Sequence, residues 1–353
     1  MGLGGAGVGF SSGQLLNDGT VIFNHAGVTD VAGRLSGNGG LRKAGSGGLV
    51  ITGGGPMDGL ITVSSGSFVL AGQATLGPIA DHRGGLAVAS GAEWVYRSTS
   101  PQTIGGSVTG SGRIVSDGSR LVLTAASTFT GTATVASGEL VLAHEQALAE
   151  AAVSVAAGAT LTLATAGRAT VNRLGLANGG LVDVAAGGLT VEAGLTPAAV
   201  VAAVITGRGD GSWTGTGFTS SAVAAAVAAG TSRTLGWLDH GGGSITVAYA
   251  APGDTNIDGA IDILDAANFF AGQAFDSGRR ASWFEGDFTY DGIVDILDAA
   301  DFVSGGLYNA GNYSMASGMG AGIAAVPEPA GLSTIGLMVA GIAAARLAGR
   351  RGG

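Results

Sequence analysis

Two acidic segments, residues 254–265 and 287–298, carry the side chains whose types and spacing could do chemistry. Each has oxygen-bearing residues at positions 1, 3 and 5, glycine at position 6 and aspartate at position 12. A hard cation such as calcium needs this pattern, because alternate side-chain oxygens face the ion and the glycine permits a sharp turn. The in-register duplication predicts two calcium sites, and the simpler alternative is a pair of acidic turns.

The predicted ligands include the backbone carbonyl of position 7 and an acid at position 9. In the first loop they are Asp254, Asn256, Asp258, Ala260, Asp262 and Asp265. In the second loop they are Asp287, Thr289, Asp291, Ile293, Asp295 and Asp298. Because Thr289 supplies only a neutral hydroxyl at position 3, we expect the second Ca²⁺ site to be weaker. The apolar residues at position 8, Ile261 and Val294, predict that the two loops pair through a short strand contact.

The paired loops resemble the type I dockerin module of secreted bacterial proteins over roughly residues 253–312. This resemblance implies an all-α calcium module in which one helix follows each loop. Cohesin-binding dockerins carry small hydroxyl residues at positions 10 and 11, whereas this chain has Ile263-Leu264 and Ile296-Leu297. These apolar pairs suit packing inside the chain, so we do not expect a cohesin partner.

The composition favours β structure over a disordered linker. The 353 residues include 68 glycines and are 46% apolar, but only 12% are charged. Regular glycine turns between short apolar strands reconcile these values. The net charge is −9, and 11 of the 25 acids lie between Asp254 and Asp301. The chain has no cysteine for disulfides or thiolate metal sites, and its scattered arginines do not predict a nucleic-acid partner.

Residues 1–194 are predicted to form a stacked-coil domain. From about residue 10, short strands alternate with Gly, Ser and Asn turns, with strands predicted, for example, over Leu60–Leu70 and Thr132–Leu142. Similar strand–corner–strand units recur at 134–142, 153–163 and 181–191. Such units bury their apolar faces only by stacking on one another, so we predict a solenoid of about nine coils of roughly 20 residues. A β-sandwich is the alternative, because strand direction cannot be read from the sequence.

One repeat is more specific than this general pattern. Residues 35–53 contain a glycine-alternating turn, the basic pair Arg42-Lys43, a second glycine pair and an apolar strand. This segment, and Ser127–Gly131 with the strands after it, resemble the autotransporter-associated β-strand repeat. The resemblance implies a right-handed parallel β-helix exposed outside the cell.

Residues 195–252 are predicted to cap this domain and connect it to the calcium module, because an open terminal coil invites edge pairing. Thr196-Pro197 predicts a helix start, with the helix running to about Ile205. A second helix is predicted over Ser220–Ala229, followed by strands at Thr234–Leu238 and Ser244–Ala250. Together they form a small α/β cap.

The C-terminal region combines a small-residue linker (313–324) with an apolar run (330–345) inside a tail at 325–353. The residues that mark this tail are Pro327, Glu328, Pro329, Arg346, Arg350 and Arg351. Together they resemble the PEP-CTERM sorting signal. This implies export, transient membrane anchoring by a hydrophobic helix, and cleavage by an exosortase-type sorting protease. The first residues lack the features of a signal peptide, so we expect the natural start to lie upstream.

Carbohydrate-cleaving enzymes are the main catalytic alternative, because β-helices also host polysaccharide lyases and hydrolases. Such sites need carboxylates clustered on one groove, and the acids of residues 10–194 do not recur at the coil period. We interpret the dense triplet Asp81-His82-Arg83 as an exposed corner. The sequence thus predicts a non-enzymatic, exported structural or adhesive protein with extracellular polysaccharide or matrix as partner. The alternatives are a polysaccharide-binding or polysaccharide-degrading β-helix protein with a dockerin, and a scaffold-recruited subunit.

Overall fold

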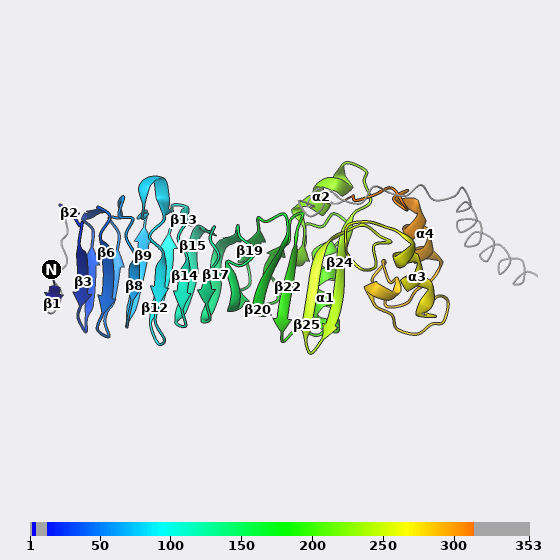
Figure 1. The fold of residues 1–353 in the computed structure, drawn as a ribbon, viewed down its shortest axis with the longest axis horizontal. Coiled ribbons are helices and arrows are strands. Elements are labelled where there is room, and N and C mark those ends of the chain that lie inside the picture. Colours follow the sequence, from blue (N-terminus) through cyan, green and yellow to red (C-terminus); the bar gives the residue numbers. More distant parts are fainter. Residues whose placement is uncertain (1, 5–12, 314–353) are drawn as a thin grey trace, which may run out of the picture. The chain divides into compact units, whose positions relative to one another are not determined.

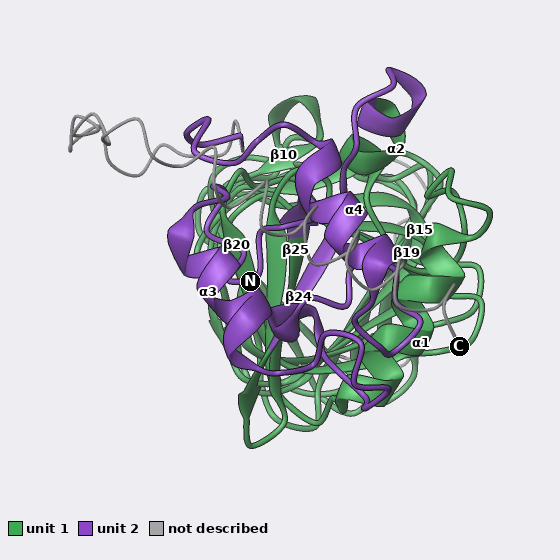
Figure 2. Ribbon diagram, turned by 90° about the vertical axis from the view of Figure 1, so that its right-hand side faces the viewer, with its two compact units in different colours: residues 1–225, 239–248 green, residues 226–238, 249–353 purple. Residues whose placement is uncertain are grey.

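A computed structural model describes residues 2–4 and 13–313 of the chain. The chain divides into two compact units, which Figure 2 colours separately. Unit 1 contains residues 1–225 and 239–248, and unit 2 contains residues 226–238 and 249–353. The predicted sorting tail and all of the linker except Tyr313 lie outside the described residues.

Unit 1 is a parallel β-solenoid of about nine turns, as predicted (Figure 1). Along the solenoid, up to β22, strands pair in parallel with the strand one coil further on, so that Thr20 lies opposite Gly40 and Arg113 lies opposite Thr132. This parallel pairing excludes the β-sandwich. The right-handed sense of the coil stays a prediction.

Three sheets form the walls of the solenoid and its end. The seven-stranded sheet contains β1 (Gly2–Gly4), β3 (Thr20–Asn24), β6 (Gly40–Ala44), β8 (Ile61–Val63), β11 (Leu86–Val88), β14 (Val108–Gly110) and β16 (Thr128–Phe129). The main path of the sixteen-stranded sheet contains β4 (Val28–Val31), β7 (Gly48–Ile51), β9 (Ser67–Gly72), β12 (Glu93–Ser98), β15 (Arg113–Leu123), β17 (Thr132–Leu142), β18 (Leu148–Val155), β20 (Arg168–Leu176), β22 (Gly188–Ala193), β25 (Ser244–Ala250) and β24 (Thr234–Gly241). Its side strands are β10 (Asp81–His82), β13 (Gln102–Ile104), β19 (Thr160–Leu163), β21 (Leu181–Asp183) and β23 (Gly217–Thr219). The two-stranded sheet pairs β2 (Gln14–Leu16) with β5 (Arg34–Ser36).

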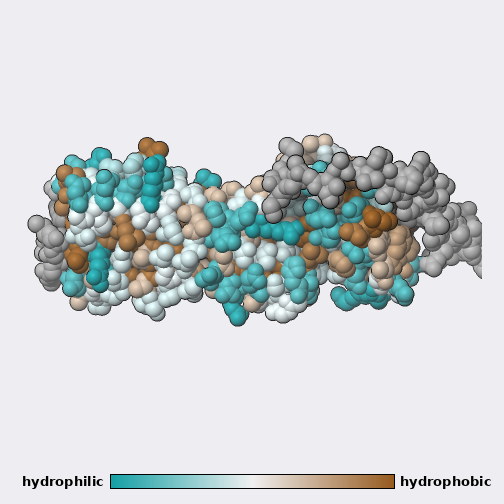
Figure 3. Space-filling model, in the orientation of Figure 1, coloured by the Kyte–Doolittle hydropathy of each residue, from teal (hydrophilic) through white to brown (hydrophobic). Residues whose placement is uncertain are grey.

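The solenoid core consists of rows of apolar side chains that repeat once per coil. In one row, Phe68, Trp94 and Ile114 lie opposite one another in successive strands, and all three are buried. Alternate residues point outward because successive side chains of a strand face opposite sides of its sheet. Figure 3 shows that the visible outer face of the solenoid is mostly weakly polar, with scattered hydrophobic residues.

Corners of the solenoid depend on glycine at certain positions. Gly138 lies within the bent strand β17 at φ +64°, and a Cβ atom there would lie 1.9 Å from the Gly118 carbonyl oxygen of the preceding coil. Side chains are therefore excluded both by the left-handed backbone conformation and by the neighbouring chain. The β15–β17 register shifts near Asp117, where the coil turns.

The capping region follows its local sequence signals. Helix α1 (Pro197–Arg208) begins after Thr196, whose hydroxyl accepts a 3.3 Å hydrogen bond from the Ala199 amide. Helix α2 spans Ser221–Ala228. Strand β25 pairs antiparallel with β22 and thereby ends the parallel stacking of unit 1. The predicted helices and closing strands are thus found, with small differences in their bounds.

Unit 2 contains two loop–helix segments around an aromatic core. Helices α3 (Ile263–Ala271) and α4 (Ile296–Ser304) follow the two acidic loops, and a 3₁₀ turn, η2, spans Trp283–Glu285. In this core, the ring centroid of Phe288 lies 5.0 Å from that of Trp283 and 6.1 Å from that of Phe269. Among the described residues, no helix is both long enough and apolar enough to span a membrane.

Candidate metal centre

Both acidic loops turn at the glycine in position 6. Gly259 and Gly292 have φ angles of +91° and +88°, in the left-handed region that glycine adopts readily. Their amides donate 3.0 Å hydrogen bonds to Oδ2 of Asp254 and Oδ2 of Asp287, respectively. In each loop, the turn therefore holds one oxygen of the first carboxylate and leaves its second oxygen to another partner.

The aspartates at position 12 tie the start of each loop to its helix. Oδ1 of Asp265 accepts a 2.8 Å hydrogen bond from the Thr255 amide, and Oδ2 accepts one from the Asp262 amide at 2.9 Å. Asp298 does the same in the second loop, accepting from the amides of Phe288 and Asp295, each at 2.9 Å. The two predicted position-12 ligands thus have equivalent places in the two loops.

The position-9 aspartates cap the N-terminal ends of the two helices. Asp262 and Asp295 are the N-caps of α3 and α4, and they accept 2.7 Å hydrogen bonds from the amides of Leu264 and Leu297. With the position-12 acids they form capping boxes, which satisfy amides that the first helical turn leaves unpaired. Helix capping therefore accounts for these two residues whether or not they also contact an ion.

Four carboxylates of the two loops are buried. The exposed fraction is 0% for Asp254, Asp265 and Asp298, and 4% for Asp287. Burial raises the pKa of Asp254 to about 7 and that of Asp287 to about 7, because a charged carboxylate loses its hydration. Burial also raises the pKa of Asp265 and Asp298. A bound divalent cation would offset this cost, because it supplies the opposite charge.

The second loop contains an orphaned carboxylate oxygen. Oδ1 of Asp287 is buried and has no hydrogen-bond partner, which is costly for a polar atom removed from water. The corresponding Oδ1 of Asp254 accepts a longer, 3.2 Å bond from the Asp258 amide. A hard cation coordinated by these oxygens would satisfy both, so the donor set fits calcium.

The remaining predicted side-chain ligands do not converge on one point. Asp258 and Asp291 are exposed, and Asp258 accepts a 2.8 Å hydrogen bond from the Asn256 side-chain amide. The described residues hold no group of three or more His, Cys, Asp and Glu side chains arranged to bind a metal ion. A complete cage would need Asp258 and Asp291 in addition to the buried carboxylates, joined by Asn256, Thr289 and the carbonyls of Ala260 and Ile293.

Two predictions about the apolar loop residues are wrong. Ile261 bridges to Tyr308 and Val294 bridges to Phe275, so position 8 pairs each loop with a later or earlier segment and not with the other loop. The apolar pairs at positions 10 and 11 do not pack inside the chain. The exposed fractions are 55% and 59% for Ile263 and Leu264, and 50% and 59% for Ile296 and Leu297. Both residues of each pair are exposed in the first helical turn, whereas the position-12 aspartate of the same turn is buried.

Two aromatic residues of the site were not predicted. The indole Nε1 of Trp283 donates a 2.7 Å hydrogen bond to the carbonyl oxygen of Asp254. The hydroxyl of Tyr313 donates to Oδ2 of the same residue at 2.5 Å. These partners are 29 and 59 positions away in sequence, beyond the reach of any local pattern.

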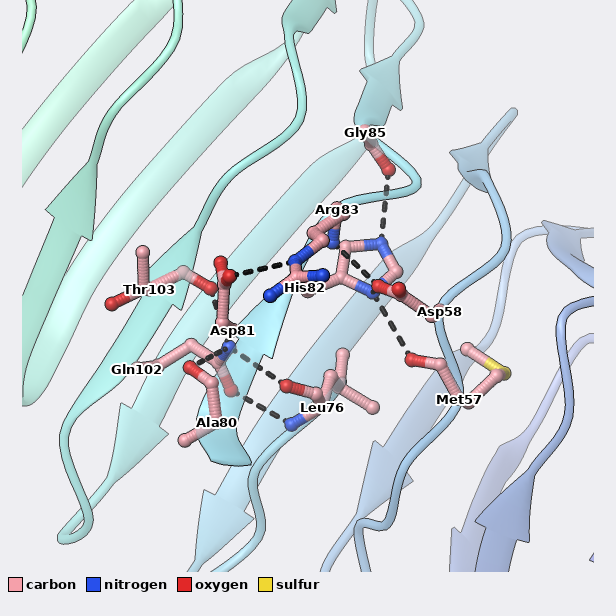
Figure 4. Close-up of polar contacts among 10 residues, drawn as sticks. All are labelled: Met57, Asp58, Leu76, Ala80, Asp81, His82, Arg83, Gly85, Gln102 and Thr103. Atoms are coloured by element: carbon pink, nitrogen blue, oxygen red, sulfur yellow. Dashed lines mark hydrogen bonds and ion pairs between the residues drawn. The ribbon is translucent and has the colours of Figure 1, made fainter. Parts of the chain in front are cut away.

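A second polar cluster lies in unit 1, where the triplet Asp81-His82-Arg83 is not simply an exposed corner (Figure 4). His82 is fully buried, and its two ring nitrogens lie 3.2 Å from the carbonyl oxygens of Met57 and Gly85. Arg83 pairs with Asp81 at 2.9 Å, while the Gln102 side chain contacts backbone groups of the adjacent turn. These contacts hold the wide corner between β9 and β11 together, so we assign the cluster a structural role.

A groove crosses the outer face of the large sheet in unit 1. Its volume is about 460 Å³, and its lining includes Arg113, Thr134, Ser154 and Arg173. Arg113 and Arg173 belong to one outward row, three coils apart, through the pairs Arg113–Thr132, Thr132–Ala152 and Ala152–Arg173. At about 4.8 Å per coil, their backbones are separated by roughly 14 Å.

Neither the loops nor the groove can be assigned by similarity. Comparisons with protein-family models, with curated proteins and with solved structures found no match for this chain.

Proposed function

We propose that this chain is an exported, surface-associated structural or adhesive protein with two Ca²⁺ sites and no catalysis of its own. The solenoid would form the extended part, and the module at 253–312, similar to a dockerin, would depend on calcium for its stability. Exosortase-type processing of the tail at 325–353 would follow transient anchoring in the membrane. The export and sorting part of this proposal rests on the sequence resemblance alone.

The buried, unpartnered Oδ1 of Asp287 is the observation that supports calcium binding most strongly. Acidic turns without a cation would keep their carboxylates in water, where hydration stabilises the charge. Here, the carboxylates at positions 1 and 12 of both loops are buried. The repetition of this arrangement in two loops supports a common ligand, and its oxygen chemistry favours calcium.

Calorimetric titration of the full chain with CaCl₂ tests the proposal. We expect two binding events, of which one is lost on Asp258→Ala and the other on Asp291→Ala, because each change removes one exposed ligand. The matched control is Asp239→Ala, which removes an exposed carboxylate of unit 1 that lies outside both loops. Absence of calcium-dependent heat from the wild-type chain would refute calcium binding.

Catalysis is tested separately on a panel of polysaccharides. The proposal expects no release of reducing ends or of unsaturated sugar products above the background of a heat-denatured sample. Release that depends on a carboxylate of unit 1 would replace the structural function with an enzymatic one.

The groove of unit 1 favours a second candidate function, polysaccharide binding. Two arginines stand at opposite ends of a floor made of Thr132, Thr134, Ala152 and Ser154, and no carboxylate is among its lining residues. Arg113 is also 3.5 Å from Glu93, a carboxylate outside the lining, so a ligand would share this guanidinium with Glu93. Such a surface suits an extended acidic polysaccharide, because guanidinium groups pair with carboxylates and hydroxyls bond to sugars. The absence of carboxylates from the lining favours binding over cleavage.

Affinity electrophoresis in gels containing polygalacturonate or neutral dextran tests this candidate. We expect retardation by polygalacturonate, lost in the Arg113→Ala/Arg173→Ala double variant. The double variant Arg34→Ala/Arg42→Ala removes the same charge from exposed positions outside the groove and should bind as the wild type does. Equal retardation of both variants would show general charge attraction and exclude a site in the groove.

The exposed apolar pairs bear on the cohesin question. Because Ile263, Leu264, Ile296 and Leu297 are exposed, packing inside the chain is no longer a reason to exclude a cohesin. Their apolar character, where cohesin-binding dockerins carry hydroxyl residues, remains as a chemical reason. We therefore propose no cohesin partner, and a pull-down with a purified cohesin domain tests this directly.

A further inference from the structure

Tyr313 makes three polar contacts around the first acidic loop. Its hydroxyl oxygen accepts a 2.9 Å hydrogen bond from the Ala251 amide, and its hydroxyl proton is donated to Oδ2 of Asp254 at 2.5 Å. Its own amide donates a 2.9 Å bond to the carbonyl oxygen of Gly259. The same tyrosine therefore contacts the first carboxylate of the loop and the glycine at which the loop turns.

The residues before Tyr313 run beside the same loop. Tyr308 forms a parallel bridge with Ile261, and the Asn309 amide donates a 2.9 Å hydrogen bond to the Ile261 carbonyl oxygen. The Arg233 guanidinium carbon lies 4.9 Å from the centroid of the Tyr313 ring, within the range of a cation–π contact. Residues 308–313 thus lie along the first loop, and we call this segment the C-terminal strap.

The two loops differ in whether a tyrosine hydroxyl contacts the carboxylate at position 1. Oδ2 of Asp287 accepts from the Gly292 amide, as Oδ2 of Asp254 accepts from Gly259. Among the described residues, however, no tyrosine hydroxyl donates to Asp287, and its Oδ1 has no partner. The hydroxyl contact is therefore a property of the first loop and not of the repeated motif.

We propose that Tyr313 is a positioning residue of the first Ca²⁺ site, and that calcium binding at this site is coupled to the seating of the C-terminal strap. This inference rests on the proposed calcium function. Donation to Oδ2 fixes the plane of the Asp254 carboxylate, while Oδ1, which accepts one 3.2 Å bond from the Asp258 amide, keeps a second lone pair for an ion. Because coupling is reciprocal, calcium must hold the strap in place as strongly as the strap improves calcium affinity.

Calcium titrations of single-site chains test the positioning role. In Asp291→Ala, where only the first loop binds, we expect Tyr313→Phe to weaken affinity by roughly tenfold or more, as is typical of lost outer-shell partners. In Asp258→Ala, where only the second loop binds, Tyr313→Phe should leave affinity unchanged. Phenylalanine keeps the ring and its contact with Arg233, so only the hydroxyl is removed.

Limited chymotrypsin cleavage after residue 313 provides a second measurement, because tyrosine and phenylalanine are both cleavage sites. In the Asp291→Ala chain, calcium should slow this cleavage, and it should do so less when Tyr313→Phe is added. The inference is supported if Tyr313→Phe weakens calcium affinity in the Asp291→Ala chain but not in the Asp258→Ala chain, and if it also reduces the protection by calcium against cleavage. Equal affinity with and without the hydroxyl, or an equal loss at both sites, overturns it. Absence of calcium uptake by the Asp291→Ala and Asp258→Ala parents would instead remove the proposed function.

Discussion

Burial of the position-1 aspartates links the stability of unit 2 to pH. Asp254 and Asp287 have pKa values raised to about 7 from 3.8 by burial. Between these values the folded state binds more protons than the unfolded state, so the free energy of unfolding falls as pH rises. This stabilising effect is complete below the unfolded pKa and is lost as pH passes through about 7.

We therefore predict that metal-free unit 2 is more stable at pH 4.5 than at pH 7.5, and that calcium reverses this order. Calcium requires deprotonated ligands, so its stabilising effect grows as the pH rises. Urea unfolding is followed by the fluorescence of Trp283 in a chain whose other tryptophans, Trp94, Trp213 and Trp237, are replaced by phenylalanine. Measurements in EGTA and in excess calcium give both trends. A metal-free stability that rises with pH would contradict this account of the buried carboxylates.

Lys43 provides a residue-scale prediction for unit 1. This lysine, which is fully buried, donates to the carbonyl oxygens of Ala44 at 2.8 Å, Gly45 at 2.9 Å and Ser65 at 3.3 Å. Burial lowers its pKa, but these three acceptors compensate the ammonium. Lys43→Met keeps the length and removes every donor, so we expect a loss of about 2 kcal/mol in the free energy of unfolding of unit 1.

Chemical denaturation of unit 1 checks this value. Arg42→Met, at the adjacent exposed position, is the matched control and should change the free energy of unfolding by less than about 0.5 kcal/mol. A Lys43→Met chain as stable as the wild type would mean that the cost of burying the ammonium cancels its three hydrogen bonds.

The residues of the candidate site were predictable only where the pattern is local. The alternation of acids and the glycine at position 6 identify Asp254, Gly259 and Asp265 directly. The structure gives them places equivalent to those of Asp287, Gly292 and Asp298 in the second loop. Tyr313 and Trp283 could not be predicted in this way. They reach Asp254 through the packing of distant segments, which leaves no periodic trace in the sequence.

At the scale of the element, the apolar residues in the first turns of α3 and α4 are exposed, whereas an apolar residue later in α3 is buried. Ile263 and Leu264 are exposed, whereas Phe269 in the same helix is 3% exposed and packs against Phe288. Replacing Ile263-Leu264 with Ser-Thr should therefore change the free energy of unfolding by less than about 1 kcal/mol. Phe269→Ala should cost about 3–5 kcal/mol, because it opens a cavity in the aromatic core.

Thermal unfolding of the two variants in calcium measures this difference. A large loss of stability in the Ser-Thr variant would show that the exposed pair is covered when the chain is folded in solution.

Elements with strong local signals were predicted closely, and the others were not. The strand Thr132–Leu142 and the start of α1 at Pro197 are found where the sequence places them. The continuous strand predicted over Leu60–Leu70 is instead β8 and β9, separated by a turn at Gly66, where φ is +68°. The apolar and polar residues of this segment alternate as they would in one strand. The turn at Gly66 is needed only because the chain must change direction to complete a coil. The direction in which two strands pair also depends on the coil as a whole. Parallel pairing was therefore inferred from the repeats and not from any single strand.

At the scale of the whole molecule, the two units should respond differently to calcium. Unit 1 is stabilised by apolar rows and backbone ladders that contain no predicted calcium ligand, whereas unit 2 holds both acidic loops. A ligand that binds only the folded state stabilises it by about 2.7 kcal/mol at a free concentration of 100 times its Kd. Removal of calcium should thus lower the stability of unit 2 and leave that of unit 1 unchanged.

Hydrogen exchange followed by mass spectrometry of the full chain measures this difference, because peptides report each unit separately. On addition of EGTA, peptides from 253–312 should lose protection by about tenfold or more, which corresponds to at least about 1.4 kcal/mol. Peptides from strands β12 to β20 should keep their exchange rates and serve as the internal control. An equal loss of protection in both units would mean that the solenoid itself depends on calcium. Unchanged exchange in both units would mean that protons, and not calcium, stabilise the buried carboxylates.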